Sequence, residues 1–331
     1  MAKIGILGAG TWGTALAKTL LSHNEVTLWS ALPAEIESLD KYRVHPNLPG
    51  MAVPAELRLT TEIGNAVTGM DVVVFAVASP YTRKTAEAAS PFIKEDQIIV
   101  DVAKGLEPTT HMTLTEVISD ALGMPQIALV ALSGPTHAEE VALEMPTTIV
   151  AASADIRVAE YIQQTFSNEV LRVYTNTDIK GVEICGAMKN IIALAAGVSD
   201  GLGFGDNAKA ALITRGMMEI TRLGTAMGGR KETFTSLAGI GDLIVTCTSK
   251  HSRNNRTGVM IGQGVSPEDA VREIGMVVEG INALPAAMAL AKQYGVELPI
   301  CEMVHSVLSG KIAASDAIKY FMARDLKPEY V

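Results

Sequence analysis

Short apolar runs recur through the first half of the chain, and polar or glycine-containing segments separate them. Continuous, β-branched runs of about four to eight residues are typical of strands that are buried on both faces of a parallel sheet. The pattern predicts strands at residues 4–7, 26–29, 71–77, 97–102, 127–132, 147–151 and 171–174. Helical spacing at 12–21 and 82–89 predicts crossover helices, whereas residues 33–70 are expected to be mixed and rich in loops.

The strand pattern stops near Thr177, and longer helical patterns follow it. They predict helices at residues 178–198, 207–227, 279–294, 299–308 and 313–324. Strands that alternate with helices form parallel sheets. We therefore expect an α/β domain at residues 1–177 and a mainly α-helical domain at residues 178–331.

A glycine motif follows the first predicted strand and opens the first predicted helix. Gly8, Gly10 and Gly13 form the pattern G-x-G-x-x-G. Gly8 permits a tight turn, Gly10 lets a pyrophosphate approach the backbone, and Gly13 lets the helix pack close to the strand. The helix N-terminus then offers free N–H groups to the phosphates. A glycine-rich turn without a ligand is the alternative, but the position between strand and helix favours a Rossmann-type fold that binds a dinucleotide.

The residues after the second predicted strand decide which dinucleotide such a fold prefers. An acidic residue there hydrogen-bonds the ribose of NAD, and an arginine holds the 2′-phosphate of NADP. This sequence has Ser30, Ala31 and Leu32 at that place. The local pattern therefore leaves the choice between NADH and NADPH open.

Other polar residues follow later strands of the predicted sheet. Ser79, Lys104 and the segment 134–136 each come directly after a predicted strand. Ligands bind open α/β sheets beyond the carboxyl ends of the strands. We therefore expect these residues to lie at the same edge as the glycine motif.

Lys189 lies within a helical pattern that is apolar on every side. A helix of that kind is buried, and a buried cation is rarely tolerated without a purpose. Burial disfavours the ammonium form, which suits a lysine that transfers protons. The alternative is a lysine whose flexible side chain reaches solvent at the edge of the domain.

Two further clusters follow in the helical half. Asp242 stands between a glycine and an apolar run, so we expect it to be desolvated and paired with Lys189 or Lys104. Residues 252–254 precede a predicted helix and combine a hydroxyl, a guanidinium and backbone N–H groups, which together suit a phosphate. A solvated polar loop is the alternative for this second cluster.

Composition excludes several classes of protein. The 331 residues are 48% hydrophobic and 19% charged, which indicates a globular chain, and the net charge of -9 argues against general nucleic-acid binding. Three distant cysteines without a CxxC pattern indicate neither a disulfide framework nor a metal site. We find no signal peptide and expect no apolar run of membrane length, so a cytoplasmic protein without a membrane span is predicted.

Several motifs, taken in order, resemble one family, the bacterial NAD(P)-dependent sn-glycerol-3-phosphate dehydrogenases. The resemblance covers residues 4 to about 308 and rests on GAGTWGTALA, AKGLE, SGPTHAEE, GAMKNIIALAAGVSDGLGFGDNAKAALITRG, AGIGDLIVTCTSKHSRNNRTG and VVEG. It implies a Rossmann-type domain followed by an all-α domain like that of 6-phosphogluconate dehydrogenase. It also implies a homodimer and a role in supplying glycerophospholipid synthesis.

The same resemblance implies roles for individual residues. It makes Lys189 the catalytic acid and base, with Lys104, Asp242 and Thr246 as the other catalytic residues. The residues it implies around the cofactor are Gly8, Gly10, Thr11, Trp12, Gly13, Lys104, Ala138, Arg253, Val277 and Glu279. The residues it implies around the phosphorylated substrate are Lys104, Gly134, Thr136, Lys189, Asn190, Asp242, Ser252, Arg253 and Asn254.

One position departs from the family pattern. Members often carry a basic residue just after the second strand, where this chain has Ala31. Ser30 could still bind a 2′-phosphate, and Lys41 or Arg43 could fold towards it. The cofactor is therefore expected to be NADPH or NADH, without a stated preference.

Three other functions remain open from the sequence. A related two-domain dehydrogenase could act on a 3-hydroxy acid or on ketopantoate. A non-catalytic dinucleotide sensor would keep the glycine motif but would have no use for Lys189 together with Asp242. A structural helical dimerisation module would explain the second half of the chain but not the phosphate cluster.

Overall fold

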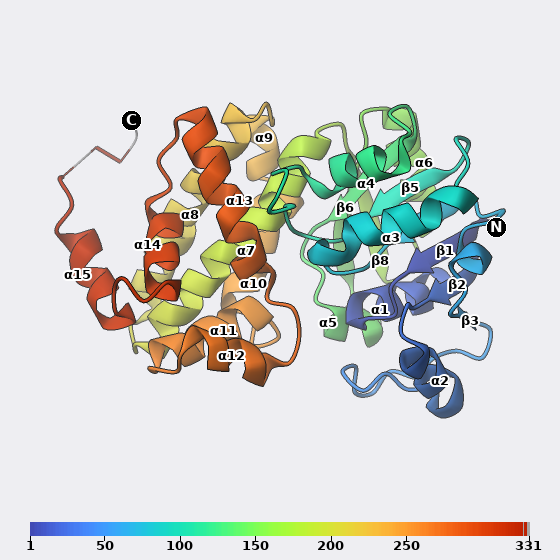
Figure 1. Cartoon of the computed structure of the whole chain (residues 1–331), viewed down its shortest axis with the longest axis horizontal. Helices are drawn as coiled ribbons and strands as arrows, with labels where there is room; N and C mark the ends of the chain where they lie inside the picture. The colour runs from blue at the N-terminus through green and yellow to red at the C-terminus, as the bar shows by residue number, and fades with distance from the viewer. Residues whose placement is uncertain (327, 330–331) are drawn as a thin grey trace.

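The computed structural model describes residues 1–326 and 328–329, and it divides them between a sheet-containing part and a helical part (Figure 1). The strands are β1 (Lys3–Leu7), β2 (Glu25–Trp29), β3 (Arg58–Thr60), β4 (Val72–Phe75), β5 (Ile98–Asp101), β6 (Ala128–Ser133), β7 (Thr147–Ala152) and β8 (Leu171–Asn176). They form one eight-stranded sheet in the order β3-β2-β1-β4-β5-β6-β7-β8. The sequence pattern missed only the short β3.

The sheet is mostly parallel, as expected, but β7 runs antiparallel to β6. The chain between these strands contains only α5 (Ala138–Ala142), a helix of five residues. Such a helix spans about 7.5 Å, whereas returning along a six-residue strand needs about 20 Å. The chain therefore turns back at the same edge of the sheet, and the β6–β7 pair departs from the otherwise parallel arrangement that the sequence predicted.

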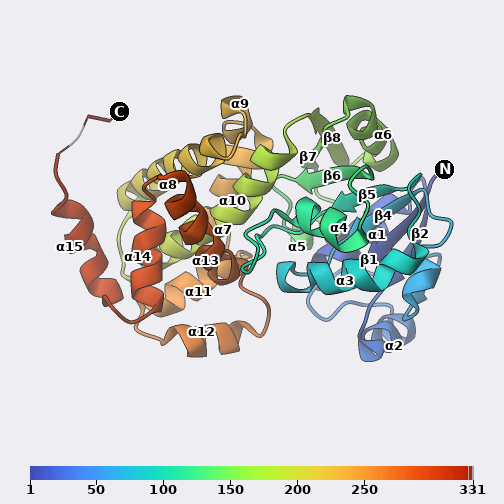
Figure 2. The same cartoon turned by 45° about the horizontal axis from the view of Figure 1, so that its top comes forward.

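Helices cover both faces of the sheet, as Figure 2 shows. One face packs against α1 (Thr11–Leu20), α5 and α6 (Ile156–Phe166), and the other packs against α3 (Thr82–Ala89) and α4 (Leu114–Leu122). The region expected to be loops begins with α2 (Pro33–Tyr42), which has proline in its first turn and only two buried residues. Two buried residues make a weak apolar stripe, so the sequence pattern did not predict α2 as a helix.

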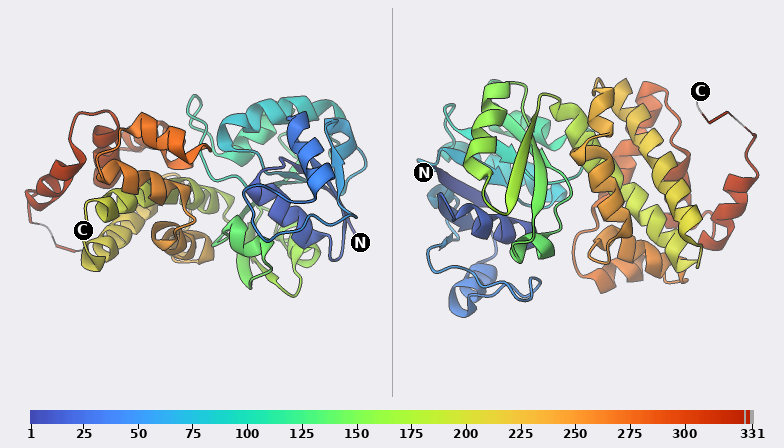
Figure 3. Two further views of the ribbon diagram at one scale, coloured as in Figure 1. Left: turned by 90° about the horizontal axis from the view of Figure 1, so that it is seen from below. Right: turned by 180° about the vertical axis from the view of Figure 1, so that it is seen from behind.

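The helical part is built around α7 (Ile179–Gly201). The other helices are α8 (Asp206–Ala226), α9 (Lys231–Phe234), α10 (Asp242–Thr248), α11 (Arg253–Gly262), α12 (Pro267–Ile274), α13 (Glu279–Tyr294), α14 (Pro299–Leu308) and α15 (Ala317–Met322). Helix α15 lies at the end of the molecule farthest from the sheet, as the views from below and behind show (Figure 3).

Helix α7 is long and apolar enough to cross a membrane, contrary to the expectation that no apolar run reaches that length. Of the 18 residues in its most apolar segment, 89% are buried inside the protein. Helix α7 is therefore the central core helix of this part. The residues on all its sides pack against α8, α10, α11, α13 and α14. The apolar pattern around Lys189 therefore reflects burial against protein.

Helices α7 and α11 approach one another more closely than ordinary side chains allow. A Cβ atom added at Gly197 would lie 2.0 Å from the carbonyl oxygen of Asn255, and one at Gly258 would lie 2.1 Å from that of Leu194. Only glycine fits at these two positions. This contact fixes the N-terminus of α11, and with it residues 252–254, relative to Lys189.

Candidate active site

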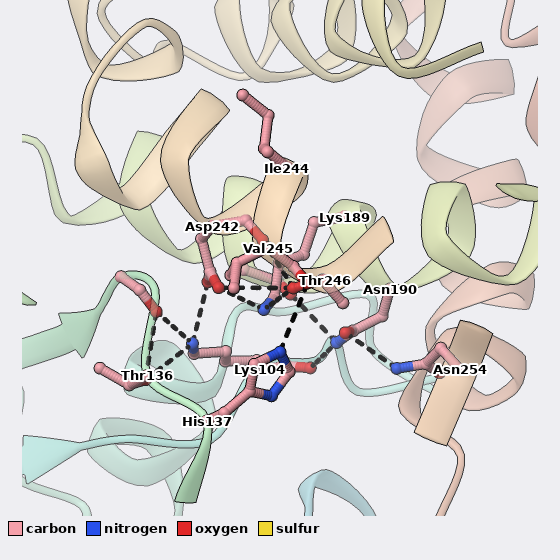
Figure 4. A network of polar contacts seen from close by, with 12 residues as sticks. Lys104, Thr136, His137, Lys189, Asn190, Asp242, Ile244, Val245, Thr246 and Asn254 are labelled. Atoms are coloured by element: carbon pink, nitrogen blue, oxygen red, sulfur yellow. Dashed lines mark hydrogen bonds and ion pairs between the residues drawn. The ribbon is translucent and has the colours of Figure 1, made fainter. Parts of the chain in front are cut away.

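Side chains from the sheet and from the helical part meet at the carboxyl edge of the sheet. Lys104 follows β5, Lys189 comes from the middle of α7, and Asp242 is the first residue of α10. Figure 4 shows the three charged groups converging on one another. Asp242 therefore pairs with both of the lysines that the sequence offered as alternatives.

The Asp242 carboxylate lies between the two ammonium groups. Its Oδ1 accepts a hydrogen bond from Lys189 Nζ at 2.5 Å, and its Oδ2 accepts one from Lys104 Nζ at 2.9 Å. The side chains of Lys189 and Asp242 are 7% and 1% exposed, while that of Lys104 is 16% exposed. The expectation that Lys189 is buried is thus confirmed, and its side chain does not reach bulk solvent.

A π-helical turn places Asp242 in this position. Residues Leu237–Gly241 form the turn, which runs directly into α10. A π-turn next to an α-helix is frequent at functional sites, since it rotates the following side chains out of the regular register. One turn later, Thr246 accepts a hydrogen bond from Lys189 Nζ at 2.7 Å and donates to the Asp242 carbonyl at 2.6 Å.

Burial and charge act in opposite directions on this pair. Burial lowers the pKa of Lys189 to about 8, since the attraction of Asp242 offsets only part of that effect and Lys104 adds to it. Burial alone would raise the pKa of Asp242, but Lys104 and Lys189 hold it below its usual range. Near neutral pH, Lys189 is therefore mainly protonated, with a pKa of about 8 that lies close to neutrality.

The loop after β6 lies against the Lys104 side chain. Lys104 Nζ donates to the carbonyl of Gly134 at 2.9 Å and lies 3.4 Å from Thr136 Oγ1. Gly134 has a φ of +151°, a conformation that L side chains rarely adopt. Beside them, His137 Nε2 lies 3.4 Å from the carbonyl oxygen of Val245 (Figure 4).

A chain of amide hydrogen bonds leads from this cluster to residues 252–254 at the start of α11. Asn190 Nδ2 donates to the Lys104 carbonyl at 3.0 Å, and Asn190 Oδ1 accepts from Asn254 Nδ2 at 3.0 Å. Asn254 Oδ1 in turn accepts from the N–H of Gly280 at 2.8 Å. The amide of Asn254 is thus bonded at both ends, so the structure shows it as a link between α7, α11 and α13.

Ser252 and Arg253 begin α11. The Ser252 hydroxyl caps this helix by accepting from the N–H of Asn255 at 3.2 Å. The half-buried Arg253 donates from Nη1 to the carbonyl of Val277 at 3.1 Å, which leaves other guanidinium N–H groups for a ligand. A hydroxyl, a guanidinium and a helix N-terminus therefore stand together here.

The glycine motif fits a dinucleotide in its backbone geometry. A Cβ at Gly8, which has a φ of +126°, would lie 2.7 Å from the carbonyl oxygen of Ala76, and one at Gly13 would lie 2.0 Å from that of Gly8. At Gly10, by contrast, an added Cβ would meet no protein atom within 4 Å. Protein packing therefore explains the first and third glycines, and the open space at the second fits a pyrophosphate at the start of α1.

A second link between the two parts joins α13 to the loop after β4. Glu279 Oε1 accepts from the N–H of Ser79 at 3.0 Å, and Glu279 Oε2 accepts from the Ser79 hydroxyl at 2.5 Å. Burial raises the pKa of Glu279, and these hydrogen bonds partly offset the rise. Glu279 precedes Gly280, so this link is continuous with the amide chain through Asn254. The sequence placed Ser79 at the ligand-binding edge but gave no sign of its partner.

Some expected site residues lie outside this network. Thr11 and Trp12 form the first turn of α1 with the glycine motif, and Ala138 begins α5, which packs against α1. Among the residues that the structure describes, no hydrogen bond joins these three to Lys189. Within the same residues, no cluster of three or more histidine, cysteine, aspartate or glutamate side chains has a geometry that could hold a metal ion.

Comparisons with known proteins agree over the whole length of the chain. Two family models match, described as the N-terminus and the C-terminus of NAD-dependent glycerol-3-phosphate dehydrogenase, at residues 3–159 and 178–319. A glycerol-3-phosphate dehydrogenase (NAD(P)+) from Lactobacillus delbrueckii subsp. bulgaricus is 55% identical over 334 residues, which cover 99% of each chain. One from Bacillus subtilis is 48% identical over 98% of this chain and 95% of its own.

A solved structure agrees with these sequence matches. The crystal structure of glycerol-3-phosphate dehydrogenase from Coxiella burnetii superposes with a TM-score of 0.93 at 36% identity. The match covers 98% of this chain and 99% of that chain.

Proposed function

The chain belongs to the family of NAD-dependent glycerol-3-phosphate dehydrogenases, and we propose that Lys189 is the acid and base of its reaction. The activity is the reversible transfer of a hydride between NAD(P)H and dihydroxyacetone phosphate, which gives sn-glycerol 3-phosphate. The observation that carries the proposal for Lys189 is its buried ammonium, which is bonded to Asp242 and Thr246 at the edge where ligands bind. This membership sets aside the three other functions that the sequence left open.

The proposed roles follow from how charge develops during the reaction. The bound nicotinamide supplies the hydride for reduction and accepts it in oxidation. As a hydride reaches C2 of the substrate, negative charge grows on the carbonyl oxygen, and Lys189 donates a proton to that oxygen. Lys104 adds positive potential nearby, while Asp242 and Thr246 orient the Lys189 ammonium. In the reverse direction, neutral Lys189 removes the hydroxyl proton.

The substrate phosphate is proposed to lie against Ser252 and Arg253. The guanidinium of Arg253, the hydroxyl of Ser252 and the N-terminus of α11 support this placement. Asn254 is also proposed to contact the phosphate while it keeps its hydrogen bond to Asn190. Binding energy from a phosphate that does not react can then orient the carbonyl group towards Lys189. Gly134 and Thr136, which contact Lys104, are proposed to border the three-carbon part of the substrate.

The cofactor is proposed to bind along the carboxyl edge of the sheet. Its pyrophosphate would lie at the glycine motif, Thr11 and Trp12, with Ala138 beside them on α5 and Val277, Glu279 and Arg253 on the far side. Residues 1–177 would then serve as the cofactor domain and residues 178–331 as the catalytic domain. A cytoplasmic homodimer that supplies glycerophospholipid synthesis completes the proposal.

The test compares substrates and one variant by following nicotinamide absorbance. Purified protein is expected to reduce dihydroxyacetone phosphate with NADH or NADPH and to leave ketopantoate and 3-keto acids unreacted. Lys189→Ala is expected to lower kcat by about 10²- to 10⁴-fold, the usual contribution of an acid–base group, and to leave the Kd of the reduced cofactor unchanged. Lys319→Ala, at a side chain that is 78% exposed, is the matched control. An unchanged kcat in Lys189→Ala would refute the assigned role.

A further inference from the structure

The carboxyl end of β2 carries a pair of side chains that the reaction does not use. Ser30 follows β2 directly and is only 4% exposed. Its hydroxyl donates to Glu35 Oε2 at 2.5 Å and accepts from the N–H of Leu32 at 3.1 Å. Glu35 lies in the first turn of α2, so this helix holds a carboxylate at the end of the strand. The sequence pattern did not reveal it, because Glu35 lies five residues beyond Ser30 on a helix that was not predicted.

The end of β2, where a dinucleotide-binding fold contacts the adenosine ribose, lies next to the glycine motif. Gly8 N–H donates to the carbonyl of Trp29, the last residue of β2, at 2.9 Å. Burial lowers the pKa of His45, while the charge of Glu35 acts in the opposite direction. Because its pKa is below the ordinary value, His45 is mainly neutral at pH 7.

The lysines and arginines of residues 30–60 have other partners or lie elsewhere. Arg43 pairs with Asp40 at 2.5 Å and also donates to the carbonyl of Pro54. Arg58 pairs with Glu25 at 3.0 Å, at the opposite end of β2. Lys41 lies over the ring of Tyr42, with Nζ 5.0 Å from its centre. Within the described residues, no ion pair brings any of these three cations to Glu35.

We propose that the pair formed by Ser30 and Glu35 makes this enzyme prefer NADH over NADPH. The inference rests on the proposed function, because it places the adenosine ribose at the end of β2. A carboxylate there accepts a hydrogen bond from the 2′-hydroxyl of NADH. The 2′-phosphate of NADPH carries a charge of about -1.5 to -2 at pH 7, and it would be repelled by that carboxylate, with which no cation of the described residues forms an ion pair.

Two variants on the same helix test this preference. The measurement is kcat/KM for NADH and for NADPH, with the full-length protein and saturating dihydroxyacetone phosphate. The unaltered protein is expected to favour NADH at least about tenfold. Glu35→Gln is expected to raise kcat/KM for NADPH about tenfold and to lower that for NADH about three- to tenfold, because an amide oxygen accepts a weaker hydrogen bond from the 2′-hydroxyl than a carboxylate does. Glutamine still accepts the hydrogen bond from Ser30, so the variant removes charge and keeps the local structure. Glu37→Gln, at an exposed position of the same helix, is expected to leave the ratio unchanged.

The outcomes separate the inference from the function on which it rests. A preference for NADPH in the unaltered protein, or an unchanged ratio in Glu35→Gln, would overturn the inference. If neither cofactor supported turnover, the proposed function would fail, and fluorescence titration would still measure the Kd for NADH and NADPH. Equal Kd values in that titration, or tighter NADPH binding, would overturn the inference independently.

Discussion

Replacing Asp242 with asparagine tests how the charges in the site set the pKa of Lys189. The substitution keeps the size of the side chain and removes the charge of the carboxylate that pairs with both Lys189 and Lys104. In the unaltered protein, kcat/KM for reduction is expected to fall as the pH rises through about 8, because Lys189 then loses the proton that it must donate. In Asp242→Asn, the same fall is expected at a lower pH.

The size of this shift follows from the geometry of the pair. At the 2.5 Å that separate Lys189 Nζ from Asp242 Oδ1, and with an effective dielectric constant of about 20, Coulomb attraction amounts to about 6 to 7 kcal/mol. Breaking a buried ion pair costs about 3 to 5 kcal/mol after the surroundings relax, and here two lysines share that cost. About 1.5 to 2.5 kcal/mol therefore falls on Lys189, which corresponds to a decrease in its pKa of about one to two pH units.

The assay is a pH profile of kcat/KM for dihydroxyacetone phosphate. It runs from about pH 5.5 to about pH 9.5, so that it covers the pKa values expected for Lys189 in both proteins. The falling limb is expected near pH 8 in the unaltered protein and between about pH 6 and 7 in Asp242→Asn. Asp120→Asn, which removes a 52% exposed carboxylate paired with Arg83, is the control and should leave the limb in place. If the limb of Asp242→Asn stayed near pH 8 or moved upward, the electrostatic reasoning would be refuted.

Two other predictions address substrate binding and stability. Arg253→Ala is expected to raise KM for dihydroxyacetone phosphate by at least about tenfold, the loss of one charge-assisted contact, and to affect the reduction of unphosphorylated dihydroxyacetone much less; an equal effect on both substrates would contradict a phosphate contact. Gly258→Ala is expected to destabilise the protein by about 2 to 4 kcal/mol in urea unfolding, because its Cβ would lie 2.1 Å from the carbonyl oxygen of Leu194. Gly205→Ala, where the added methyl group meets nothing within 4 Å, should change stability by less than about 1 kcal/mol. Similar losses in the two glycine variants would show that the close approach of α7 and α11 is not the cause.

Elements with strong local patterns were predicted almost to the residue. The helices at 82–89, 279–294 and 299–308 have the expected bounds, because their apolar residues recur at helical spacing. Helix α2, with its weak buried stripe, was missed, and so were α4 and α6, although both of them bury an apolar face. The antiparallel strand β7 was also misjudged, because a single strand has the same pattern whichever way it runs.

The sequence alone predicted that Lys189 would be buried, because the helix around it is apolar on every side, while a side chain that reaches solvent stayed open as the alternative. It also predicted a cationic partner for Asp242, because a carboxylate between a glycine and an apolar run is expected to be desolvated. Only the tertiary structure decided that one carboxylate would serve both lysines, since that depends on how α7, α10 and the loop after β5 meet. The same holds for Ser79 with Glu279 and for Ser30 with Glu35. A hydrogen bond between distant residues depends on the relative placement of whole elements, and no local spacing of residues along the chain records that placement.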